Sequence, residues 1–371
     1  MSFFSFFKAK PANILLLDIG DHSIKYLVMR PNQKGERDVL IAAEKQVDEI
    51  SWEREMHGII QSVRKEFSYI RSLHFALPPL LFRAEVFEYT VSRKNPKLTI
   101  GVKEEKELEE QIIRFSRKEI EYYFSQAYQI PAKDLAIVKL KLLKISVDGY
   151  RAASLRGLRG NSVTMRLLGV CLPVGYRMIR ENLQKKHGIK EVRIIHWAEG
   201  LELFAADSNK EGVYIDIGEK ATQVAIIKDN LLQSVKVIPF GGDNFTYALE
   251  HHLGLQKTMA QDFKERYSRM EFSEEMRKRT HEVLEREARA WLAACKEKLL
   301  LLDQVLPSHL YVMGGTSNLR EIEEVAEEDG FRDLPLDGNL QVSLLSPASL
   351  MARMQFHQAK DPAYTPVAFL M

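Results

Sequence analysis

The sequence predicts an α/β fold with two lobes and an inserted α+β subdomain, and three observations support this prediction. The segments "LLLDIGDHSIKYLV" and "VYIDIGEKATQVAI" repeat an apolar strand, an Asp-Ile-Gly turn and a second strand at two distant points. Strand and helix patterns alternate between Leu168 and Phe204. Residues 80–169 differ in character, with charged strand-like segments around one amphipathic helix. The two repeats therefore indicate one lobe each, and the charged region indicates an insertion.

The composition is that of an ordinary globular protein and excludes several classes of function. The 371 residues are 45% hydrophobic and 28% charged, which favours about two to three domains. A net charge of +2, from 53 basic and 51 acidic residues, argues against nucleic acid as a partner of the whole chain. The two cysteines, Cys171 and Cys295, form no CxxC pair, so we expect a reducing, cytoplasmic location and no cysteine-rich metal site.

Residues 1–10 form an aromatic tail with two interpretations. The tail lacks a basic segment before its apolar stretch, which ends at Lys8, so it does not read as a secretory signal. One interpretation is peripheral contact with a membrane or docking on a partner. The other, which we favour, is an apolar tail that packs on its own domain or stays unstructured. The residues concerned are Phe3, Phe4, Phe6 and Phe7.

The first lobe is expected to begin with residues 11–79. Residues 13–30 read as a hairpin with its turn at "DHS", apolar spacing predicts a helix from Asp48 to Arg71, and "LHFALP" reads as a strand. In the insertion, 80–169, "EEKELEEQIIRFSRKEIEYYF" predicts an amphipathic helix beside one sheet. Its arginine-rich "GLRGNS" turn is better explained as a solvated hairpin than as a nucleic-acid surface, because few aromatic side chains lie near it.

The remaining segments complete both lobes. Residues 170–210 are assigned to the first lobe, within a predicted βαβα unit that starts at "LLGVCLPV". Residues 211–371 are assigned to the second lobe, where "SVKVIPFGGDNFTYALEHHLG" reads as strand, glycine turn and helix, with Asp243 or Asn244 as the cap. A nearly continuous charged helix is expected at about 256–302, followed by the strand and glycine turn of "LYVMGGTSN".

The repeated Asp-Ile-Gly turns have a chemistry suited to phosphate. Glycine lets backbone amides approach phosphate oxygens, and an aspartate can hold hydrated magnesium. A single Asp-x-Gly is more often a plain tight turn. Two copies on separate lobes, together with the double glycine at Gly314 and Gly315, form a more specific set, since paired glycines allow a base and sugar to pack on the backbone.

The order of these motifs resembles the actin-like (ribonuclease H-like) ATPase superfamily, and within it the FtsA/PilM type. The segment "DIGEKATQVAIIKDNLLQSVKVIPFGGDNFTYAL" is similar to both members of that type, and "DIGDHSIK" is similar to the first loop of PilM proteins. Residues 80–169 fall where FtsA and PilM carry their inserted subdomain. The resemblance implies a two-lobed ATPase fold that binds ATP with Mg²⁺.

Position by position, the resemblance implies a set of nucleotide-binding residues. Asp18 and Asp216 would hold Mg²⁺ through water. The first phosphate loop and its exit would comprise Asp18, Gly20, Ser23 and Lys25. The second loop and the turn after it would comprise Asp216, Gly218, Thr222, Gly241 and Gly242. The adenosine turn would comprise Gly314, Gly315 and Asn318.

Several positions depart from the family pattern. Glu219 and Lys220 stand where the second loop is usually glycine-rich, and Asp21 places a carboxylate in the first loop, where it would repel phosphate. These departures predict weak or conditional ATP binding. For a residue that orients the attacking water, spacing offers His196 or Glu199, although a histidine beside a tryptophan is more often a packing residue. We therefore expect slow ATP hydrolysis or none.

The resemblance favours an ATP-binding scaffold of the PilM type at the cytoplasmic face of the inner membrane, in type IV pilus or related secretion assembly. Its partner would be a short cytoplasmic segment of an inner-membrane assembly protein, with self-association into dimers or filaments as a further expectation. An FtsA-like cell-division protein that links filaments to the membrane is an alternative. A nucleotide-free structural module is another, and a sugar or acetate kinase is disfavoured because no sugar-binding constellation is evident.

Overall fold

The computed structural model describes residues 12–32, 37–47, 51–67, 69–208, 210–302, 304–331, 333–350 and 360–371. The expected helix start at Asp48 lies outside the described residues. So does the aromatic tail, with Phe3, Phe4, Phe6 and Phe7.

The described strands form three sheets, two of which share one topology. The first sheet has the order β3-β2-β1-β4-β9, made of Arg37–Gln46, Ser23–Pro31, Asn13–Ile19, Ile70–Ala76 and Glu191–Ile194. The second has the order β12-β11-β10-β13-β14, made of Leu231–Ile238, Thr222–Lys228, Gly212–Ile217, His309–Met313 and Gln341–Leu344. In each sheet the first three strands pair in antiparallel fashion, and the last two strands run parallel to the third. The two lobes therefore repeat one architecture.

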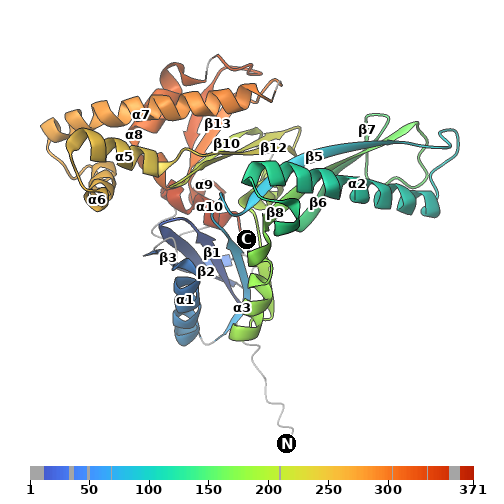
Figure 1. The fold of residues 1–371 in the computed structure, drawn as a ribbon, viewed down its shortest axis with the longest axis horizontal. Coiled ribbons are helices and arrows are strands. Elements are labelled where there is room, and N and C mark those ends of the chain that lie inside the picture. Colours follow the sequence, from blue (N-terminus) through green and yellow to red (C-terminus); the bar gives the residue numbers. More distant parts are fainter. Residues whose placement is uncertain are drawn as a thin grey trace, which may run out of the picture.

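The third sheet belongs to the insertion and extends from the two lobes as an arm. Its order is β5-β8-β6-β7, made of Arg83–Ser92, Ser162–Pro173, Leu135–Val147 and Tyr150–Ala152. The amphipathic helix α2 (Val102–Tyr128) lies along this sheet and buries Leu108, Ile112 and Phe124 (Figure 1). The root of the arm is tied to β12 of the second lobe, because Lys236 pairs with Glu85.

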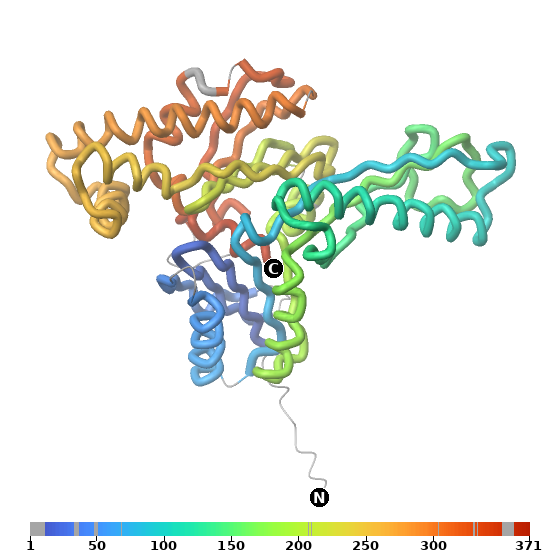
Figure 2. The backbone as a smooth tube through the Cα atoms, viewed as in Figure 1, coloured from blue at the N-terminus to red at the C-terminus, as the bar shows by residue number. Residues whose placement is uncertain are grey.

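The helices cover the sheets of the two lobes (Figure 2). α1 packs on one face of the first sheet, and α5 and α7 pack on the second, where Trp291 of α7 is fully buried. The remaining described α-helices are mostly short. The bounds are α1 (Trp52–Phe67), α3 (Ile179–His187), α4 (Trp197–Ser208), α5 (Gly242–Leu253), α6 (Lys257–Ser268), α7 (Glu274–Leu300), α8 (Arg320–Val325), α9 (Pro347–Leu350) and α10 (Thr365–Ala368).

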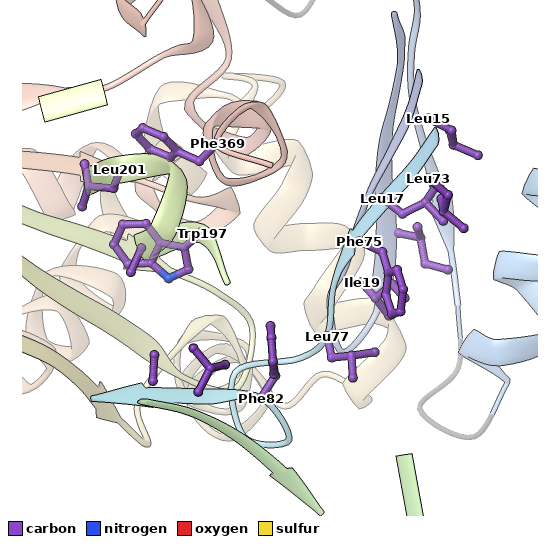
Figure 3. Packing of buried hydrophobic residues seen from close by; sticks show 14 of the residues in the cluster. Leu15, Leu17, Ile19, Leu73, Phe75, Leu77, Phe82, Trp197, Leu201 and Phe369 are labelled. Carbon is purple, nitrogen blue, oxygen red and sulfur yellow. The ribbon is translucent and has the colours of Figure 1, made fainter. Parts of the chain in front are cut away.

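Alternating side chains of β1 face two different cores. Leu15 and Leu17 point to the core that contains α1, whereas Leu16 packs against the segment around α10. Figure 3 shows Leu15 and Leu17 beside Phe75 of β4, with Trp197 of α4 further along the same cluster. This cluster also includes Tyr214 of the second sheet, so one apolar core runs through both lobes.

The structure corrects two expectations about elements. The predicted βαβα unit is not one unit, because β8 pairs with β5 and β6 in the arm, whereas β9 pairs with β4 in the first lobe. β8 therefore carries the arm's sheet to Pro173, beyond the expected boundary at residue 169. The helical region expected at about 256–302 consists of α6 and α7, with Met270 between them at a left-handed φ of 63°.

All three tryptophans lie in the core, as the sequence indicated. Trp52 is 6% exposed, Trp197 3% and Trp291 0%. Among the described helices, none is long and apolar enough to cross a bilayer.

Candidate functional site

The two Asp-Ile-Gly hairpins face the same cavity, which lies between the lobes and has a volume of about 100 Å³. Both hairpins close with the same turn. The Gly20 N–H donates to the Ser23 carbonyl at 2.9 Å, and the Gly218 N–H donates to the Ala221 carbonyl at 3.0 Å. The predicted site residues that line this cavity are Asp18, Gly20, Ser23, Lys25, His196, Asp216, Gly218, Gly314 and Gly315.

The two aspartates are the electrostatic centre of the cavity. Burial raises the pKa of Asp18 to about 6, with nearby Lys25 acting in the opposite direction. Burial also raises the pKa of Asp216 to about 8, and the negative charge of Asp18 raises it further. Two desolvated carboxylates that repel each other favour a bound cation, since a divalent ion would stabilise both in their charged form.

Lys25 supplies the positive charge of the first hairpin. Its ammonium Nζ lies 3.3 Å from Glu44 Oε1 on β3 and 3.4 Å from Ser23 Oγ. Burial disfavours the charged form, but attraction to Glu44 and Asp18 outweighs it and raises the pKa of Lys25 above its ordinary value. The cavity therefore contains a permanently charged ammonium group, as a phosphate-binding site requires.

The Gly-Gly turn closes the cavity from the second lobe. Gly314 has a φ of 94°, and a Cβ at this position would lie 2.5 Å from Asp216 Oδ1 and 2.6 Å from the Ile217 carbonyl. Only glycine allows this backbone to pack so closely on the end of β10. The next residues turn away into a 3₁₀ helix, Gly315–Asn318, in which Thr316 Oγ1 donates to the Gly218 carbonyl at 3.2 Å.

Sequence reasoning missed Gln223, although it lines the cavity. In the first hairpin Asp18 pairs across the strands with Lys25, and in the second Asp216 pairs with Gln223, so Gln223 is the counterpart of Lys25. Its Nε2 donates to Asp216 Oδ2 at 3.4 Å. Aligning the two hairpins by position after the aspartate would have identified it.

Three predicted residues of the second lobe do not line the cavity. Thr222 was expected to offer a hydroxyl, but this group is in the core, where it donates to the Phe240 carbonyl at 2.7 Å and accepts from Trp291 Nε1 at 3.0 Å. Gly241 and Gly242 pack beneath the second hairpin turn. A Cβ at Gly241 would lie 2.5 Å from the Glu219 carbonyl, so this glycine serves the close approach of two backbones.

Asn318 is also displaced from the expected role. Its side chain is exposed and donates from Nδ2 to Asp361 Oδ1 at 3.0 Å, which ties the Gly-Gly turn to the segment before α10. Asn244, one of the two expected caps of α5, does act there, since its Oδ1 accepts the Gly241 N–H at 3.0 Å.

The two candidates for orienting water behave differently. Glu199 lies outside the cavity, where its carboxylate accepts the His196 backbone N–H at 3.0 Å and pairs with Lys139 of the arm. This arrangement contradicts its proposed catalytic role. His196 does line the cavity, but burial lowers its pKa to about 3 and its ring packs against Phe82 and Trp197.

The second hairpin turn is held by a contact that the sequence did not predict. Lys264 of α6 is almost fully buried and donates to Glu219 Oε1 at 3.2 Å and to the Gly242 carbonyl at 2.9 Å. A Cβ at Gly242 would meet Thr316, Glu219 and Lys264 within 3 Å. The space beside Gly242 is thus filled by the side chains of Thr316, Glu219 and Lys264.

The cavity fits the phosphate and metal end of a nucleotide but not a whole one. The donor set of two aspartates and a lysine suits a magnesium phosphate. His196 and Gln223 meet in the cavity, where their interaction acts against the burial that lowers the pKa of His196. Its volume of about 100 Å³ is below the ~300 Å³ of small ligand pockets. ATP would therefore require the lobes to separate further.

This architecture is an actin-like ATPase fold, as the sequence motifs indicated. The family model described as cell division protein FtsA matches residues 213–368. The fold is similar to the solved PilM-PilN type IV pilus biogenesis complex, with a TM-score of 0.66 and 17% identity, over 96% of this chain and 97% of that one.

A second solved structure has the same fold. It is ethanolamine utilization protein EutJ from Carboxydothermus hydrogenoformans, with a TM-score of 0.50 and 15% identity, over 98% of this chain and 90% of that one. No curated protein sequence matches the chain. The family match and the fold together support an actin-like ATP-binding protein.

Proposed function

We propose that this chain is an ATP-binding scaffold protein of the PilM type, which works at the cytoplasmic face of the inner membrane in pilus or secretion assembly. The proposal of nucleotide binding rests on one observation. The two equivalent hairpins and the Gly314–Gly315 turn line the same cavity. Nucleotide binding is the function that such an arrangement of carboxylates, lysine and glycines supports best.

In this proposal each lobe contributes a different part of the phosphate site. Asp18 and Asp216 hold Mg²⁺ through water, and Lys25 neutralises phosphate charge. Bound Mg-ATP would supply a divalent cation to Asp18 and Asp216, which come from different lobes. Hydrolysis is slow or absent, because neutral His196 is a weak base with a pKa of about 3 and Glu199 faces the arm.

The proposed partner site is a groove between the arm and the first lobe. This groove has a volume of about 710 Å³ and lies between β6, α3 and α4, on the far side of Glu199 from the cavity. Its lining carries both charges, with Arg177, Arg180 and Arg193 beside Glu121 and Glu181, which suits a short peptide that has acidic and basic groups. The solved structure with this fold is a PilM-PilN complex, which favours a segment of a membrane assembly protein as the occupant.

A nucleotide-free scaffold is the second candidate function. It is favoured by the Glu219–Lys264 contact and by the small volume of the cavity. An FtsA-like role in division is supported by the family match to residues 213–368.

Thermal unfolding with and without Mg-ATP distinguishes the first two candidates. We expect Mg-ATP at about 100 times its Kd to raise the free energy of unfolding by about 2.7 kcal/mol in the wild type. Asp18→Ala and Asp216→Ala should each reduce this stabilisation, because each removes a magnesium ligand. The absence of any shift in the wild type would leave the nucleotide-free scaffold.

A photo-crosslinking amino acid at Leu203, which lines the groove and is 57% exposed, tests the partner proposal. We expect it to capture a membrane protein with a short cytoplasmic segment in host cells. The matched control is the same amino acid at Tyr247 on α5, which is 66% exposed. Equal capture at both positions would contradict the proposed groove.

A further inference from the structure

A second polar cluster, His22, Glu219 and Asp243, lies at the edge of the cavity, which His22 and Glu219 also line. One potential ligand atom from each of the three side chains lies within 4.8 Å of the other two. His22 Nε2 is 3.3 Å from Asp243 Oδ1. His22 comes from the first lobe, whereas Glu219 and Asp243 come from the second, so the cluster joins the two lobes at their hairpin turns.

The backbone holds these three side chains in fixed positions. The His22 carbonyl accepts the Val47 N–H at 2.8 Å, which ties the first turn to the end of β3. The Asp243 N–H donates to the Glu219 carbonyl at 2.7 Å, which couples the start of α5 directly to the second turn. A metal ion would therefore meet a largely pre-formed set of ligands, and little conformational entropy would be lost.

We propose that His22, Glu219 and Asp243 bind a divalent transition-metal ion, with Zn²⁺ as the best fit, and that this ion clamps the lobes. Imidazole nitrogen and carboxylate oxygen both bind Zn²⁺, and three protein ligands are the number found in zinc sites that keep an open position. Bonds of ~2.0–2.1 Å in a tetrahedron place neighbouring ligand atoms ~3.4 Å apart, close to the observed separation of 3.3 Å between His22 and Asp243. Mg²⁺ prefers oxygen ligands and is a poorer fit.

The charges around the cluster set the conditions for binding. Lys264 pairs with Glu219 at 3.2 Å, and Lys257 lies 4.0 Å from Asp243. The Lys257 side chain is 64% exposed and can move away into solvent, while Lys264 keeps its bond to the Gly242 carbonyl. The ion therefore takes the place of the hydrogen bond between His22 and Asp243 by binding both side chains. It shares the Glu219 carboxylate with Lys264.

Protons compete with the metal at His22. The hydrogen bond to Asp243 raises the pKa of His22, with Glu219 acting in the same direction and Lys257 against it. Nε2 must lose its proton to bind the ion, so affinity should fall as pH decreases. The clamp needs neither Asp18 nor Asp216, but His22 and Glu219 also line the cavity, so zinc binding is measured without nucleotide.

A comparable group on the second lobe is a poorer candidate. His281, Glu321 and Glu324 also lie within reach of a single ion. However, Glu321 already accepts from the Tyr267 hydroxyl at 2.5 Å and from His281 Nδ1 at 2.8 Å, and Arg320 lies 3.7 Å away. Oε1 of this carboxylate is thus already engaged by protein groups, whereas the buried Oε2 has no hydrogen-bond partner among the described residues.

Calorimetric titration of the metal-free full-length protein with ZnCl₂ tests the proposal, in a non-chelating buffer without nucleotide. We expect one ion per chain, a loss of about tenfold or more in affinity for His22→Ala, and a similar loss for Asp243→Asn. His252→Ala is the matched control, because His252 is an exposed histidine of α5, and its affinity should equal that of the wild type.

Two further measurements separate a lost ligand from a misfolded protein. Co²⁺ in place of Zn²⁺ should give visible absorption in the wild type that His22→Ala loses while its circular dichroism stays unchanged. Zn²⁺ should also raise the unfolding temperature of the wild type but not that of His22→Ala. Unchanged zinc affinity in His22→Ala, or a loss of binding in His281→Ala alone, would overturn the assignment.

Discussion

The two Asp-Ile-Gly hairpins have the same backbone but different chemistry. Both pair the aspartate with the residue seven positions later, and both close with a glycine N–H bond. That later residue is Lys25 in the first hairpin and Gln223 in the second. Burial raises the pKa of Asp18 to about 6 and that of Asp216 to about 8. The negative charge of Asp18 adds to the rise at Asp216, and the Lys25 charge acts against the rise at both carboxyl groups.

The two hairpins therefore have different roles in the proposed phosphate site. The first hairpin carries the positive charge that phosphate needs, and the second carries the carboxylate that most needs a cation. Substitutions that make one hairpin resemble the other therefore test the comparison directly.

The largest effect is expected from Lys25→Gln, which gives the first hairpin the residue type of the second. A hydrogen bond to a charged group contributes about 1.5–3 kcal/mol, so Mg-ATP affinity should fall about 10–100-fold. Titration calorimetry measures the change. Lys103→Gln, at a side chain that is 92% exposed on α2, removes the same charge elsewhere and should have no effect. Equal losses in both variants would mean that overall charge matters and the hairpin does not.

An intermediate effect is expected from Asp216→Asn on stability without ligand. Because the folded protein holds this proton up to about pH 8 and the unfolded chain releases it near 3.8, the wild type should lose stability as pH rises between these values. The neutral amide removes this loss. The variant should unfold about 2–4 °C higher than the wild type at pH 8.5, with a much smaller difference at pH 5.

Asp18→Asn provides the comparison for that experiment. Its pKa of about 6 limits the loss to a narrower pH range, so its gain at pH 8.5 should be smaller than that of Asp216→Asn. Because the pKa of His196 is low in the folded protein, all three proteins lose stability below about pH 6.5. This effect cancels when each variant is compared with the wild type. A larger gain for Asp18→Asn would contradict the assigned order of the two carboxylates.

The smallest effect is expected from neutralising the acidic residue in each turn. Glu219→Gln weakens the contact that keeps Lys264 beside Gly242, so Mg-ATP affinity should rise about 3–10-fold. Asp21→Asn relieves repulsion of phosphate and should raise affinity about twofold or less. Binding is measured without added transition metal. Weaker binding by Glu219→Gln would show that this carboxylate supports the site.

The sequence was sufficient for the architecture because the signals are local. Apolar strands, glycine turns and the amphipathic helix each depend on neighbouring residues, and their order predicted two lobes with an insertion. β8 was assigned to the wrong sheet because its partners, β5 and β6, are fixed by pairing across the chain.

The site was predicted only where its residues lie at strand ends. Thr222 was misassigned because its hydroxyl is satisfied by Trp291, which is distant in sequence. Glu199 was misassigned because Lys139 of the arm attracts it to the opposite side of α4. Lys264 carries no local signal, since its importance arises from the turn that α6 places beside it.

Because the arm is attached to β12, peptide binding in the groove and nucleotide binding in the cavity would both act on the second sheet. β12 is hydrogen-bonded to β11, the outgoing strand of the second hairpin, and its Lys236 pairs with Glu85 at the root of the arm. If occupation of the groove shifts the arm, the strain reaches the strand that carries Gln223. Thermodynamic reciprocity then requires that any factor by which nucleotide changes peptide affinity equal the factor by which peptide changes nucleotide affinity.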